Sequence, residues 1–202
     1  SYQKGEQQNQ PILMEQLKSA GFVVIISKRR TTKPADFNGA IILEAIFEEI
    51  LTAANWAPNH GQTEPWRLFV FDKNGLDNFS SFHAELYKSN ISSEQFLQKK
   101  YETIRSRTQK TSHLIVLAVS TGSKSNIPII EEICATACAA QNMLLTATAN
   151  GVSSYWGTGG MTYEPNFKKA FGLKSADQII GLLYFGYTNQ PEIEGKRNTE
   201  IN

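Results

Sequence analysis

The spacing of apolar and polar residues divides the chain into helices and strands that follow one another irregularly. Apolar positions recur at helical spacing and predict helices over Pro11 to about Ser27, about Ala40 to Asn55, 76–88, 93–110, Pro128 to about Asn150 and Pro165–Phe171. Short apolar runs predict strands over Arg67–Asp72, His113–Thr121, Val152–Trp156 and Gln178–Tyr187. Pro34 is expected to end helical conformation, and Lys73-Asn74-Gly75 to form the turn that closes the first strand.

This order of elements favours an α+β fold. One or more helices separate the strands without regular βαβ alternation, and no glycine fingerprint follows the first strand, which argues against a Rossmann fold. We therefore expect a central, mostly antiparallel sheet flanked by helices. No linker is apparent, so residues 11–202 are expected to form a single domain after a disordered, polar tail over residues 1–10.

The helix expected to end at Asn150-Gly151 is rich in alanine, which allows another helix to approach closely, in the same chain or at a subunit interface. Glu131 and Glu132 would lie at its positive end. Cys134 and Cys138 share a face of this helix, are poorly placed to bridge each other and have no histidine ligand nearby. We expect them to be buried small residues in a reducing compartment, with a reactive thiol as the alternative.

Composition and charge exclude several classes of partner. Twenty Lys and Arg against 19 Asp and Glu give a net charge of +1, which offers no electrostatic argument for a nucleic acid. The apolar run Phe22–Ile26 is far shorter than the roughly 20 residues of a membrane span. Residues 1–10 do not read as a signal peptide, so a cytoplasmic location is expected.

Three polar or irregular segments carry the candidate chemistry. The loop Trp56–Trp66 combines two tryptophans, two prolines and His60, the segment Arg29-Arg30-Thr31-Thr32 is basic, and Trp156-Gly157-Thr158-Gly159-Gly160 is rich in glycine. Together they offer anion donors, flat aromatic surface and close backbone approach, which suits a planar ligand with a phosphate tail. The alternatives are solvated charges at a helix end, an exposed histidine and a simple hairpin turn.

The order of these motifs resembles the nitroreductase family of flavoproteins over roughly residues 12–188. The resemblance rests on Arg-Arg-Thr after the first helix, an Ala-Pro loop that ends in Pro-Trp, a helix of small residues and a Trp-Gly-Thr-Gly turn. It implies an FMN-dependent NAD(P)H oxidoreductase, and usually an obligate homodimer with both flavin sites at the subunit interface. Hydride would pass through flavin N5 to an electron-poor acceptor such as a nitroaromatic or a quinone, in a ping-pong sequence.

The resemblance also assigns FMN contacts, and it requires no catalytic side chain and no metal. The residues implied are Arg29, Arg30 and Thr31 at the phosphate and ribityl chain, Lys196 and Arg197 closing over the phosphate, His60 at a flavin carbonyl or in the partner's site, and Trp156, Gly157, Thr158 and Gly159 against the ring. Trp56 stands where some relatives have a cationic FMN contact. The loop Thr121–Ile127, with Lys124, is a candidate dinucleotide contact.

Three residues depart from the family pattern: Trp56, Glu64, where many members have Gln, and Gly157, where related chains have a bulkier residue. These departures motivate a second hypothesis, a flavin-binding store or sensor without significant turnover. Nucleic-acid binding by the basic cluster is disfavoured, because no aromatic residues interleave it.

Overall fold

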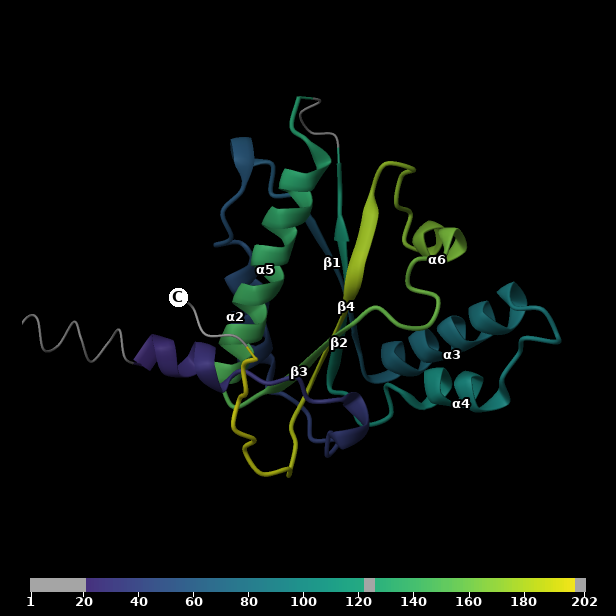
Figure 1. Cartoon of the computed structure of the whole chain (residues 1–202), viewed down its shortest axis with the longest axis horizontal. Coiled ribbons are helices and arrows are strands. Elements are labelled where there is room, and N and C mark those ends of the chain that lie inside the picture. Colours follow the sequence, from purple (N-terminus) through teal and green to yellow (C-terminus); the bar gives the residue numbers. More distant parts are fainter. Residues whose placement is uncertain (1–20, 122–125, 199–202) are drawn as a thin grey trace, which may run out of the picture.

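The computed structural model describes residues 21–121 and 126–198 (Figure 1). Its helices are α2 (Glu44–Ala54), α3 (Lys73–Asn90), α4 (Gln98–Ser106), α5 (Ile129–Ala149) and α6 (Pro165–Ala170), with 3-10 turns η1 (Pro34–Asp36) and η2 (His60–Gln62). Its strands are β1 (Trp66–Asp72), β2 (His113–Val119), β3 (Ser153–Gly157) and β4 (Gln178–Gly186). Residues 21–28 are also helical. The predicted tail over residues 1–10 and the helix start at Pro11 lie outside the described residues.

The four strands form one sheet in the order β1-β2-β4-β3, and every neighbouring pair is antiparallel. The predicted α+β class is therefore confirmed. β2 is buried at every position because β1 and β4 flank it and helices cover both faces of the sheet. This burial explains why its sequence is apolar without alternation.

Helices cover the sheet from both sides (Figure 1). Alternate residues of a strand point to opposite faces, so Ile115 and Leu117 pack with α2 and α5, whereas Leu114 and Val116 pack with α3, α4 and α6. The result is two apolar layers on a shared sheet. β3, at one edge of the sheet, is the strand closest to the candidate chemistry.

The alanine-rich helix packs closely against α2, as its composition predicts. Ala139, Ala140 and Ala147 are fully buried in the same cluster as Ala54 of α2. Small side chains at these positions let the two helix axes approach, and Gly151, with φ of 70°, ends α5. Glu131 and Glu132 do lie in the first turn of α5.

The predicted burial of the two cysteines is wrong. Cys134 and Cys138 are both exposed in the isolated chain, while Ala135 and Ala139, one residue further along, face the core. A one-residue step turns a side chain by about 100° around a helix, and the buried face of α5 is the one that meets α2 and the sheet. The cysteines therefore belong to an outer face of α5.

Four predicted boundaries differ from the observed ones. Lys73-Asn74-Gly75 is the first turn of α3 rather than a turn that closes β1, and this helix buries Leu76 and Phe79. α2 begins at Glu44 rather than Ala40, since Leu43 is extended and the Ile42 amide donates to Ser112 Oγ at 2.8 Å. The helix predicted over 93–110 is limited to Gln98–Ser106, and Pro34 opens η1 after the first helix has already ended.

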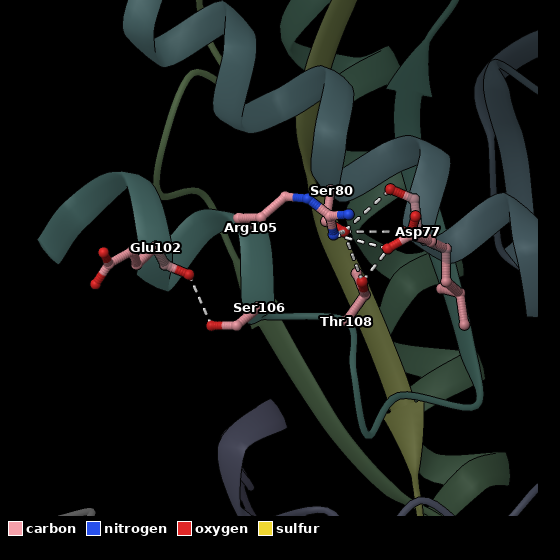
Figure 2. Close-up of polar contacts among 7 residues, drawn as sticks. Asp77, Ser80, Glu102, Arg105, Ser106 and Thr108 are labelled. Atoms are coloured by element: carbon pink, nitrogen blue, oxygen red, sulfur yellow. Dashed lines mark hydrogen bonds and ion pairs between the residues drawn. The ribbon is translucent and has the colours of Figure 1, made fainter. Parts of the chain in front are cut away.

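Polar contacts fasten α4 to α3 (Figure 2). The guanidinium of Arg105 pairs with Asp77 at 2.7 Å, and the buried Thr108 hydroxyl donates to the Leu76 carbonyl at 3.0 Å and lies 3.0 Å from Ser80 Oγ. These contacts fix the segment after α4, which carries Arg107 toward the glycine-rich turn.

Candidate functional site

The basic segment lies along the edge strand β3. Thr31 forms a parallel bridge with Ser154, and the Thr32 amide donates to the Ser154 carbonyl at 3.0 Å. Three residues further along β3 is Gly157, where the glycine-rich turn begins, and three strand residues span roughly 10 Å. Two of the three predicted segments are therefore brought together, with the basic one at one end of a short edge and the turn at the other.

The turn exposes backbone at the surface. Thr158 and Gly159 are exposed, whereas Gly157 is buried. Trp156 is 36% exposed and its indole donates to the Ile180 carbonyl at 3.2 Å, so part of this residue remains at the surface. A Cβ at Gly157 would lie 3.2 Å from Tyr155 Cδ1 and closer still to Cε1. The Tyr155 ring thus takes space that a larger residue at 157 would need.

His83 supports this turn from beneath, and sequence analysis did not single it out. The Met161 amide donates to His83 Nε2 at 2.7 Å, so this nitrogen is the acceptor and the imidazole is neutral with its proton on Nδ1. Burial, and secondarily the charge of Arg107, lower the pKa of His83 from 6.5 to about 4. Its helical spacing from Leu76 and Phe79 could have marked it as buried, but not as a partner of Met161.

Stability is expected to fall as the pH drops from 6.5, because the unfolded chain then binds a proton at His83 that the folded protein excludes. With a folded pKa of about 4 against 6.5 unfolded, this residue should cost about 2 kcal/mol of unfolding free energy at pH 5. Urea unfolding of the parent and of His83→Gln, which keeps an acceptor for Met161, would measure the difference. Equal slopes against pH in both proteins would contradict it, since His113, whose pKa burial also lowers, is present in both.

The tryptophan-containing loop is fastened to the N-terminal end of α5. His60 Nδ1 lies 2.6 Å from Glu131 Oε2, and the Thr63 hydroxyl donates to the buried Glu132 carboxylate at 2.8 Å. Gln62 and Glu64 adopt positive φ, a costly conformation that these contacts hold in place. The His60 ring is therefore oriented by Glu131 at an exposed position.

Within one chain this loop lies far from the basic segment. It meets the first turn of α5, whereas the basic segment lies beside Thr148 and Gly151 at the opposite end (Figure 1). A helix of 21 residues rises about 30 Å. Trp56 is 81% exposed at the loop's start, and Pro65 and Trp66 are buried at its end, as expected for residues that fix the entry into β1.

A cavity of about 980 Å³ lies between the basic segment, the end of α5 and the C-terminal tail, which we define as residues 188–198. Of the predicted site residues, Arg30, Thr31 and Arg197 line it. Lys196 is exposed beside Arg197. The cavity contains none of the loop or turn residues predicted for the site, so it corresponds at most to the phosphate end of such a site.

Comparisons with known proteins show the family of the chain. The model of the nitroreductase family matches residues 26–187, which is most of the chain. The chain belongs to the nitroreductase family. It is 29% identical over 155 residues to the Escherichia coli (strain K12) protein named "Putative NAD(P)H nitroreductase YdjA", covering 77% of this chain and 80% of that protein.

Solved nitroreductase structures share the fold. A nitroreductase-like family protein from Bacillus cereus superposes with a TM-score of 0.75 at 27% identity, over 89% of this chain and 91% of that one. A nitroreductase with bound FMN from Bacteroides fragilis gives a TM-score of 0.64 at 18% identity, over 89% and 94% of the two chains. At that identity the second comparison shows the fold alone.

Membrane spans and metal clusters are both absent from the described part of this nitroreductase-family chain. Within residues 21–121 and 126–198, no helix is long and apolar enough to cross a membrane. In the same described ranges, no group of three His, Cys, Asp or Glu residues is placed to hold a metal ion. Residues 122–125 of the candidate dinucleotide loop, Lys124 among them, lie outside the described part of the chain.

Proposed function

We propose that this protein is an FMN-dependent oxidoreductase that takes hydride from NAD(P)H and delivers it to an electron-poor acceptor such as a nitroaromatic or a quinone. The observation that carries the proposal is the bridge between Thr31 and Ser154, which aligns the basic segment and the glycine-rich turn along one strand edge. Similar proteins named for NAD(P)H and for bound FMN support it. The proposal includes residues 11–202 as a single flavin-binding domain in the cytoplasm, where reduced dinucleotide is at hand.

The protein's part in this chemistry is to bind and orient. FMN, when bound, would supply hydride transfer at its N5. Arg29 and Thr31 would hold the phosphate through charge-assisted and hydroxyl contacts, with Lys196 and Arg197 beside them. At the other end of the edge, the exposed backbone of Thr158 and Gly159 would approach the ring, with the indole of Trp156 as apolar cover.

The complete site is proposed to form between two copies of the chain. The loop with Trp56 and His60 lies at the end of α5 remote from the basic segment, so it could join a flavin only in a partner subunit. The outer face of α5 offers a surface for such pairing, because Ile130, Cys134 and Cys138 are exposed there. A C2 pairing would bring the same face from both copies together and create two equal sites.

A charge on this outer face should disrupt the pairing. Cys138→Arg would place an unpaired guanidinium in the interface and is expected to weaken dimerisation at least tenfold, since a desolvated charge without a partner is costly. Cys138→Ser is the matched control and should remain a dimer. Sedimentation of both variants over a range of concentrations would measure this, and unchanged dimerisation of Cys138→Arg would remove this face of α5 from the interface.

Anaerobic reduction tests the function itself. NADH or NADPH should bleach the yellow colour of the bound flavin, and addition of a nitroaromatic or quinone should restore it, as a two-step transfer requires. Bound flavin that neither dinucleotide reduces would instead establish the store or sensor, the function favoured by the departures at Trp56, Glu64 and Gly157. A protein that binds no flavin would contradict both.

A further inference from the structure

The Arg30 side chain is engaged with main-chain carbonyls rather than left free at the surface. Nε donates to the Ile193 carbonyl at 2.8 Å, and Nη1 donates to the carbonyls of Ser27 and Arg29. Two of the three guanidinium nitrogens are therefore committed to the backbone. One of these bonds crosses from the N-terminal segment to the C-terminal tail, more than 160 residues away in sequence.

Gly195 completes this contact. A Cβ at Gly195 would lie 2.7 Å from Arg30 Cζ and closer still to Nη2, so the tail can lie flat on the guanidinium only because residue 195 has no side chain. Weaker contacts flank it: Lys28 pairs with Glu192 at 3.3 Å, and Thr188 donates to the Asp36 carbonyl at 2.8 Å. The tail is thus held at several points, with Arg30 nearest its basic end.

Lys196 and Arg197 follow this contact directly, and Arg197 lines the same cavity as Thr31 and Thr32. We infer that Arg30 is a positioning residue that clamps the C-terminal tail, so that Arg197 is presented to a phosphate monoester bound at the basic segment. Arg30 and Arg29 then have different tasks, although they are adjacent and chemically identical. The identity of the ligand as a phosphate monoester rests on the proposed function, whereas the contact between Arg30 and the tail does not.

The clamp predicts a link between the ligand and the tail. If Arg197 binds the phosphate only when the tail is held, then a bound phosphate ligand must in turn favour the held tail. A variant that loses the clamp should therefore release the tail without ligand, and part of the release should be reversed by ligand. Arg29→Ala should not release the tail, because the Arg29 contact to Arg30 is made by its carbonyl.

Limited trypsin digestion of the full chain, first without flavin, tests the clamp. Cleavage after Lys196 and Arg197, followed by mass spectrometry, should be about fivefold faster in Arg30→Ala than in the parent, since proteolysis tracks the population of the open segment. Gly195→Ala should have a similar effect, because its methyl group would displace the end of the Arg30 side chain while leaving the fold intact. Arg29→Ala, the matched control, should be cut at the parent's rate.

The outcomes separate the clamp from the proposed function. Equal cleavage of parent, Arg30→Ala and Gly195→Ala would overturn the clamp, and so would equal acceleration by Arg29→Ala. A second arm adds FMN, or riboflavin as a probe without phosphate, to the parent. Slower tail cleavage with FMN alone is the expected result, and equal protection by riboflavin would overturn the link to phosphate. A chain that binds neither flavin would contradict the proposed function. The cleavage rates measured without flavin would still show whether Arg30 clamps the tail.

Discussion

Replacing Arg29 with alanine is expected to raise the dissociation constant for FMN roughly ten- to a hundredfold. A bidentate, charge-assisted contact to phosphate contributes on the order of 1.5–3 kcal/mol, and alanine removes both donors. Arg29 is suited to this contact because it stands two residues before Thr31, directly after the helix over residues 21–28, where its amide still donates to the Ile25 carbonyl at 3.0 Å. Flavin fluorescence titration of both proteins would measure the change.

Riboflavin separates this contact from general damage. It lacks the phosphate, so the parent and Arg29→Ala should bind it with about the same affinity, whereas a disturbed fold would weaken both flavins together. Unchanged affinity for FMN in the variant would contradict the phosphate contact and would favour the alternative, that Arg29 is a solvated charge near a helix end.

The second large effect is expected at the glycine-rich turn, where Gly160→Ala should lower the free energy of unfolding by about 2–4 kcal/mol. Gly160 has φ of 74°, which an alanine adopts only with strain. Its Cβ would also lie 2.7 Å from Cε1 of His83 and closer still to Nε2. His83 is 2% exposed and packs against Phe79 and Phe167, so its ring has little room to move. Chemical denaturation would measure the loss.

Gly172→Ala is the matched control for backbone strain. Gly172 has φ of 65°, but nothing lies within 4 Å of the position that a Cβ would take. Only the conformational cost should appear there, about 1 kcal/mol. If Gly160→Ala and Gly172→Ala lower the free energy of unfolding equally, contact with His83 adds nothing to the cost at Gly160. This result would contradict a role for His83 in supporting the turn.

The sequence predicts the elements that hydrophobic spacing controls. β2 is buried at every position and α5 on the face that meets α2 and the sheet, and their apolar residues are frequent enough to show this directly. Predictions from local turn chemistry were less successful. Lys73-Asn74-Gly75 has turn residues, yet burial of Leu76 and Phe79 outweighs local preference and starts a helix there.

The candidate site was predictable as segments but not as an arrangement. Residue types alone identify the basic segment and the glycine-rich turn, whereas their meeting on β3 depends on the bridge between Thr31 and Ser154, which no sequence pattern shows. No sequence pattern shows the hydrogen bond between His83 and Met161 or the one between Arg30 and the tail either, because each joins residues that are distant in sequence. The exposed cysteines had no signal beyond their shared helix face, which is equally compatible with burial.

The most direct measurement of the central claim, that two copies of this chain share FMN sites, is the mass of the species that carries the flavin. Size-exclusion chromatography with light scattering and flavin absorbance, at micromolar concentration, should show one FMN per chain in a particle of twice 22.5 kDa. A monomer that retains FMN would contradict the shared site, and a dimer without flavin that cannot be loaded with FMN would contradict the proposed function.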